Sequence, residues 1–131
     1  MENEIIEIHD SIVDGIYRLG SDIVLSFSDA YIHRSSGQAG VDPGTVWLRP
    51  ATITFKNGIL AGSSPDSPIR ISDGTLEIEG QVSPNAIPIP FDHIGNVQLS
   101  LQFEDGTKVI VSGMSSILGL SGVEKYLEQF K

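Results

Sequence analysis

The 131-residue sequence contains no cysteine, and this absence removes several classes of protein at once. A chain without thiols has no disulfide scaffold, no thiolate nucleophile, no cysteine-ligated zinc site and no iron–sulfur cluster. A domain of this length buries roughly two thirds of the surface that its unfolded chain exposes, so an apolar core can stabilise it without cross-links. We therefore expect residues 1–131 to form a single domain.

Basic residues and long apolar runs are also scarce. Lysine and arginine number 8 against 17 aspartates and glutamates, which gives a formal net charge of −9. A field of this sign repels phosphate, so we expect no nucleic-acid partner and no membrane partner. No stretch approaches the ~18 apolar residues of a membrane helix, and the acidic N-terminus lacks the features of a secretory signal. We expect a soluble, cytoplasmic protein whose charge favours a basic protein partner or a cation, although solubility alone also explains that charge.

One stretch, residues 96–113, is strongly patterned. Apolar and polar residues alternate over 97–104, which is the period of a strand with one buried face. The chain then turns at Asp105-Gly106 and returns through three apolar residues. A three-residue loop with Gly106 in the left-handed region puts apolar residues opposite one another. The pairs that it predicts are Leu99–Val111 and Leu101–Val109, with Gln102–Lys108 on the polar face.

Other segments also favour strands and turns. Residues 4–9 suit a strand, although Ile5, Ile8, Ile12 and Ile16 also fit a loose helical stripe. Residues 23–33 suit a second strand. In it, either a bulge near Ser28-Asp29 turns Ala30 and Ile32 inward, or the polar row continues into a cavity or barrel mouth. Turn dipeptides predict a turn at Asp14-Gly15, a hairpin of 52–55 with 59–61 through Asn57-Gly58, and a hairpin of 69–71 with 76–78 through Asp73-Gly74.

Prolines mark the segments that cannot lie in the middle of a sheet. Pro50 indicates an edge or a strand start, and the three prolines of 83–92 indicate an extended segment on the surface or along an edge. Ile87, Ile89 and Phe91 fall on one side of that segment and are expected to seal the core. An exposed edge at 47–50 or 84–91 could pair with another copy, which predicts a homodimer as one assembly of this chain.

The C-terminal residues predict a short helix. Ser121 and Glu124 have the spacing of a capping box. Apolar residues then recur at Val123, Tyr126, Leu127 and Phe130, the stripe of an amphipathic helix. A helix this short is unstable alone, so we expect it to dock on the sheet or across a barrel end.

No motif in the sequence specifies a chemical reaction. The three histidines, His9, His33 and His93, are far apart and match no metal-ligand spacing. The Gly113-Met114-Ser115 sequence lacks the second glycine of a nucleophile elbow, and no glycine-rich phosphate loop is present. We therefore expect no catalytic residue, no bound metal and no cofactor.

A ligand site is the remaining candidate. Residues 34–46 form the longest irregular segment, and loops of this length are often functional. Aromatic and charged residues flank it, and small antiparallel barrels hold ligands at such loops. The predicted ligand-binding residues are Tyr31, His33, Arg34, Trp47 and Arg49.

Several short patterns are distributed along the chain: W-L-x-P at 47–50, I-P-I-P at 87–90, D-x-x-G-x-V-x-L at 92–99, the E-D-G turn and a closing E-x-F. Together they resemble a family of small bacterial proteins of unknown function. The resemblance covers most of the chain and implies a compact β fold. It implies nothing about chemistry.

These observations predict a mainly β domain, an antiparallel barrel or sandwich of about eight strands with a short C-terminal helix. The functional prediction is a non-enzymatic binding or interaction module. It would hold a small apolar ligand in a barrel or present an acidic surface to a basic protein. The alternative is a small enzyme with a polar site around Asp29, Tyr31 and His33, which requires these three residues to converge in a concave pocket.

Overall fold

The computed structural model describes residues 2–130, and every regular element in that range is a β-strand. The predicted mainly β fold is confirmed, with ten strands where about eight were expected. The strands are β1 (Asn3–Leu19), β2 (Asp22–Ser35), β3 (Gly44–Lys56), β4 (Ile59–Gly62), β5 (Ile69–Ile78), β6 (Gln81–Pro84), β7 (Ala86–Ile89), β8 (Asp92–Phe103), β9 (Lys108–Leu120) and β10 (Lys125–Phe130).

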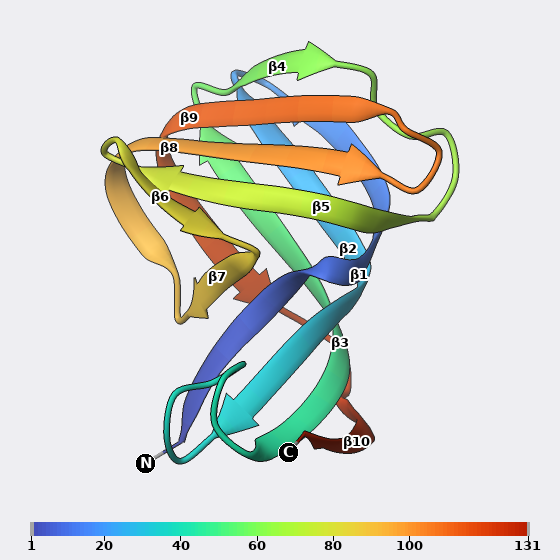
Figure 1. Cartoon of the computed structure of the whole chain (residues 1–131). Coiled ribbons are helices and arrows are strands. Elements are labelled where there is room, and N and C mark those ends of the chain that lie inside the picture. The colour runs from blue at the N-terminus through green and yellow to red at the C-terminus, as the bar shows by residue number, and fades with distance from the viewer. Residues whose placement is uncertain (1, 131) are drawn as a thin grey trace.

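Six of these strands close into an antiparallel barrel. Hydrogen-bonded neighbours follow the order β1-β2-β3-β9-β8-β5, and β5 pairs with β1 to complete the circle. The other four strands extend the sheet: β4 pairs with β9, β6 with β5, β7 with β1 and β10 with β3. The barrel lies at one end of the molecule, and β1, β2 and β3 run on beyond it, where β7 pairs with β1 and β10 pairs with β3 (Figure 1). The sequence did not distinguish a barrel from a sandwich, and the closure of these six strands identifies a barrel.

The interior of the barrel is a packed core. Phe27, Phe55 and Phe103 are fully buried, and aliphatic side chains from all six barrel strands surround them. A six-stranded barrel has a narrow interior that side chains of this size fill.

The predicted hairpin of residues 96–113 is confirmed in its register. β8 and β9 pair Leu99 with Val111, Leu101 with Val109 and Gln102 with Lys108. Gly106 has a φ of 87°, which is the left-handed conformation that the three-residue loop requires. The bulge predicted in the second strand is also present, because the β2–β3 register shifts between Phe27 and Ala30. Ala30 and Ile32 are buried, as that bulge predicted.

One predicted turn and two predicted hairpins are wrong. Asp14-Gly15 lies inside β1, and Asp73-Gly74 lies inside β5, where a bulge after Ile71 replaces the expected hairpin. Asn57-Gly58 separates β3 from β4, but both strands pair with the same edge of β9 in one continuous register. The long strands of a small barrel must bend, and bulges at glycine supply that bending.

The predicted C-terminal helix is also wrong. Residues 125–130 form strand β10, which pairs with residues 44–48 of β3. Ser121 does not cap a helix, and its N–H instead donates to the carbonyl of Pro50 at 3.0 Å. Pro50 lies within β3 at the point where the neighbouring strand changes from β10 to β9, so its missing N–H breaks no ladder.

The edge predicted at 47–50 is covered, because Leu48 pairs with β2 on one side and with β10 on the other. The proline-rich segment is extended along a sheet edge as predicted, and β7 pairs with residues 4–7 of β1. Ile87 and Phe91 are buried and Ile89 packs against the core, so this segment does seal it. The homodimer stays a prediction.

Across residues 2–130, no helix is present that could cross a membrane.

Candidate functional site

The most regular polar surface is a row of side chains on the outer wall of the barrel. Glu77 of β5 lies opposite Gln98 of β8, Gln98 lies opposite Ser112 of β9, and Ser112 lies opposite Ile59 of β4. On the other side, Glu77 lies opposite Val82 of β6. Their sequence neighbours, such as Leu76, Leu99 and Val111, point into the core. Alternation along each strand therefore aligns five outward residues across five adjacent strands.

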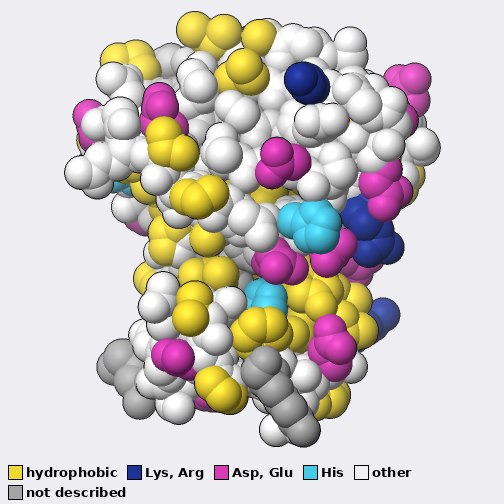
Figure 2. Space-filling view, viewed as in Figure 1, with side chains coloured by type: hydrophobic (Ala, Val, Ile, Leu, Met, Phe, Trp, Pro, Cys, Tyr) yellow, Lys and Arg dark blue, Asp and Glu magenta, His cyan; other side chains and the backbone are white. Residues whose placement is uncertain are grey.

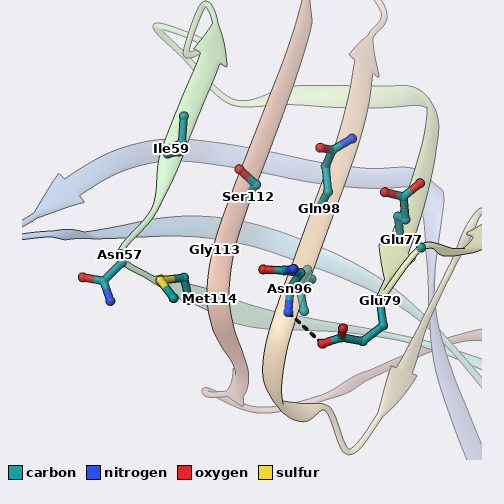
Figure 3. Close-up of a pocket in the computed structure, with 11 residues that line it drawn as sticks. Asn57, Ile59, Glu77, Glu79, Asn96, Gln98, Ser112, Gly113 and Met114 are labelled. Carbon is teal, nitrogen blue, oxygen red and sulfur yellow. Dashed lines mark hydrogen bonds between the residues drawn. The ribbon is translucent and has the colours of Figure 1, made fainter.

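This row crosses a shallow pocket of about 240 Å³, which we call the acidic groove (Figure 3). Its central side chains are polar, and its two carboxylates come from Glu77 and Glu79. Ile59 and Met114 line one side and are 67% and 63% exposed. The lining residues are Asn57, Ile59, Glu77, Glu79, Gly80, Asn96, Val97, Gln98, Ser112, Gly113 and Met114.

Glu79 closes one end of the acidic groove. It has a positive φ of 50°, and a bulge in β8 between Ile94 and Val97 lies beside it. The backbone N–H of Asn96 donates to its carboxylate at 2.9 Å, an interaction visible in Figure 3. His93 Nε2 lies 3.3 Å from the same oxygen. These contacts fix the Glu79 carboxylate although the side chain is about half exposed.

Neither Glu77 nor Glu79 forms an ion pair with lysine or arginine among the described residues. Elsewhere on the surface such pairs are present, as between Asp22 and Lys56 at 3.0 Å. The acidic groove therefore has two carboxylates without a lysine or arginine partner, with exposed apolar side chains along one side.

A second polar cluster lies where β1 leaves the barrel. Glu7, His9 and Asp10 bring one potential ligand atom each to within 4.8 Å of the others, and His33 of β2 approaches Glu7. We call these four residues the waist cluster. On this face, histidine and carboxylate side chains gather at the narrow part of the molecule (Figure 2).

A wide groove of about 730 Å³ opens beside the waist cluster. Glu7 and His33 contribute to it from the sheet, and its walls are loop residues 37–41 and residues 83–86 at the connection of β6 with β7. It is the larger of the two pockets described here, but it has a single carboxylate.

The predicted site residues do not form one site. Tyr31 and His33 share a face of β2, with their rings 5.5 Å apart. Arg34 follows His33 directly and therefore faces the other way, where it lies 4.7 Å from the Trp47 ring. Arg49 is bound through its Nε–H to the carbonyl of Ser121 at 3.1 Å.

The Arg34 side chain is held by contacts with three other side chains. Its guanidinium donates to Glu4 at 2.9 Å and to Glu124 at 2.6 Å, and it covers Trp47. The hydrogen bond to Glu124 is the main reason that the pKa of Arg34 is raised above its usual value. These contacts join β1, β2 and the segment that leads into β10.

Tyr31 is held by a hydrogen bond from its hydroxyl to Glu128 at 2.8 Å. Burial and this hydrogen bond raise its pKa well above the usual value, and the charges of Glu7 and Asp10 add to the shift. Asp29, the third residue of the enzyme hypothesis, lies opposite Ile12 beyond the bulge and lines neither pocket described here.

Comparison of this chain with protein-family models, with curated proteins and with solved structures finds no match. The resemblance to a bacterial family stays a prediction.

Neither candidate surface was predicted from the sequence. Glu77 and Glu79 have the two-residue spacing of one strand face, a pattern that solvated charge alone explains. The signal that could have revealed the groove is the outward register of β8, in which Gln98 alternates with buried residues. The waist cluster depends on the backbone at Asp10, for which the sequence has no signal.

Proposed function

We propose that this protein is a non-enzymatic interaction module that binds a basic segment of a protein partner in the acidic groove. The observation that carries this proposal is the row from Val82 to Ile59, which has carboxylate and amide groups at its centre and exposed apolar side chains at its ends. Such a surface matches a segment with lysine or arginine between two apolar residues.

The charge of the whole molecule supports a basic partner. The formal net charge of −9 attracts cationic surfaces over distance. Within the groove, Glu77 and Glu79 are available to a partner because no lysine or arginine of the described chain is paired with them. Association should therefore weaken as ionic strength rises.

The dimensions of the row limit the length of the segment. Five adjacent strands span four inter-strand spacings, or about 19 Å at ~4.8 Å each. An extended chain covers that distance in about six residues. We therefore expect a hexapeptide with apolar residues at both ends and basic residues between them to be sufficient.

The packed barrel interior favours this surface over a small ligand in the lumen. Phe27, Phe55 and Phe103 occupy the interior with the aliphatic core. A ligand there would have to displace well-packed side chains, and that displacement is costly.

The proposal is tested by titrating the protein with the amidated hexapeptide Val-Lys-Lys-Arg-Lys-Ile and measuring Kd by calorimetry. The variant Glu77→Gln/Glu79→Gln should bind about tenfold more weakly, since each exposed ion pair is worth up to ~1 kcal/mol.

The matched control is Asp14→Asn/Asp66→Asn, which changes the net charge equally at two exposed residues outside the groove. It should retain most of the affinity. If both double variants weaken peptide binding equally, net charge alone explains the effect, and the proposal is overturned.

A further inference from the structure

The waist cluster depends on one unusual backbone conformation. In a regular strand, residues 7 and 9 share a face and residue 10 points to the opposite face. Asp10 instead has a φ of 78° within an irregular stretch of β1 between Glu7 and Ile12. This conformation brings Asp10 to the face of its neighbours, where its Oδ2 lies 3.3 Å from His9 Nδ1.

The irregular stretch is held in place by a buried serine. The Ser11 hydroxyl donates to the carbonyl of Glu7 at 2.7 Å and accepts from the N–H of Tyr31 at 2.9 Å. It therefore replaces ladder bonds that the bulge interrupts, and the arrangement of residues 7–10 is stabilised from within the sheet.

His33 is an independent observation at the same place. Its side chain is 5% exposed, and within residues 2–130 neither ring nitrogen has a hydrogen-bond partner. Buried polar atoms are normally satisfied, so an unpaired buried imidazole needs an explanation. Nε2 faces the Glu7 carboxylate at 3.7 Å, which is too long for a hydrogen bond.

That separation suits two ligands of one metal ion. Ligand atoms about 2.0 Å from a tetrahedral zinc ion are about 3.3 Å apart. The Glu7–His33 and His9–Asp10 separations of 3.7 and 3.3 Å are both close to this value. The ligand atoms of Glu7, His9 and Asp10 already lie within 4.8 Å of one another, and His33 would join the same ion from beside Glu7 by rotation of its side chain.

We propose that the waist cluster binds a divalent transition-metal ion of the zinc type, with Glu7, His9, Asp10 and His33 as ligands. Two imidazoles with two carboxylates suit zinc and its neighbours, whereas calcium and magnesium prefer oxygen ligands alone. The site goes beyond the proposed function and shares no residue with the acidic groove.

The surrounding charges are compatible with a cation. Arg70 is the nearest basic group, at 3.9 Å from Asp10 Oδ1, and it is also paired with Glu104 at 3.3 Å. The other oxygen of Asp10 faces His9 and stays available to the ion. Such an outer contact orients a ligating carboxylate.

The test uses untagged, chelator-treated protein titrated with zinc chloride by calorimetry, with cobalt(II) absorption as a report of the coordination geometry. We expect one ion per chain and a tetrahedral cobalt spectrum. His9→Ala and His33→Ala should each weaken zinc binding by more than about 10–100-fold, because loss of an outer-shell partner alone has an effect of that size.

His93→Ala is the matched control, because His93 also lies beside a carboxylate, that of Glu79, away from the waist cluster. It should bind zinc as the unmodified protein does. His9 is half exposed, so its variant decides the question even if His33→Ala fails to fold. Absence of binding, or equal losses in His9→Ala and His93→Ala, would overturn the metal site and would leave the peptide result unaffected.

Discussion

At the scale of single residues, glycine determines where the long strands can bend and approach the core. Gly74 is buried in β5, and a Cβ at this position would meet the side chains of Ile8 and Leu101. The Asp73-Gly74 pair resembles a hairpin turn in sequence, but the glycine is needed for space. A single sequence does not distinguish these two reasons for a glycine.

Gly74→Ala is therefore expected to destabilise the protein by about 1–3 kcal/mol, because the added methyl group overpacks the core. Urea unfolding measures this change. Gly119→Ala is the control, since its Cβ would have only an ordinary contact with Thr52, at 3.4 Å. Equal stability of the Gly74 variant and the unmodified protein would contradict the packing described for β5.

At the scale of elements, local pattern predicted the strands better than their partners. The 96–113 hairpin was predictable because the alternation and the Asp105-Gly106 turn agree with each other. The hairpin predicted at Asn57-Gly58 is wrong because β4 pairs with β9, which is distant in sequence. Pairing between distant segments cannot be deduced from turn residues alone.

The C-terminal segment shows the same limit. Val123, Tyr126, Leu127 and Phe130 fit a helical stripe, but a helix this short has little stability of its own. As a strand, β10 satisfies the backbone groups of residues 44–48, and Tyr126 packs edge-to-face on Trp47 at 5.3 Å. Tertiary pairing therefore prevails over local periodicity.

The ion pair beside β10 predicts a pH dependence. The hydrogen bond from Arg34 is the main reason that the pKa of Glu124 is lowered from 4.5. The folded state then binds fewer protons than the unfolded state, so this stabilisation is present above about pH 4.5 and is lost as the pH falls through the folded pKa.

Glu124→Gln should therefore lower the free energy of unfolding by up to about 1 kcal/mol at pH 6, a modest value because the Glu124 side chain is a third exposed. The loss should be smaller at pH 3, where Glu124 is closer to protonation in the unmodified protein. Thermal unfolding from pH 6 to pH 3 measures this difference. Glu2→Gln, at an exposed residue, is the control and should show no such trend. A Glu124→Gln penalty that grows toward low pH would contradict the assigned ion pair.

At the scale of the whole molecule, the sequence predicted the β class but not the closure or the sites. Closure requires β1 to pair with both β2 and β5, and β3 to pair with β9. The β1–β5 and β3–β9 pairs join segments that are distant in the chain. Tyr31 and His33 do lie together, as their spacing on one strand predicted, whereas Arg34 and Trp47 meet on the opposite face. The acidic groove combines side chains of β4, β5, β8 and β9, so the alternation in β8 alone does not identify it.

Hydrogen exchange should reveal the same organisation. Amides of β8 and β9 that are hydrogen-bonded within the closed barrel should exchange only by global unfolding. Amides of β10 should exchange by local opening, because β10 pairs with a single neighbouring strand. We expect protection at least about 100-fold greater in β8 than in β10. Equal protection in both strands would contradict an edge position for β10.

The most direct test of the central claim is to locate the bound peptide by NMR. Backbone amide shifts are recorded while the labelled protein is titrated with Val-Lys-Lys-Arg-Lys-Ile. The acidic-groove account predicts saturable shifts centred on Glu77, Gln98 and Ser112, and their loss in Glu77→Gln/Glu79→Gln. Shifts centred on another face, or spread evenly over the acidic surface, would contradict it.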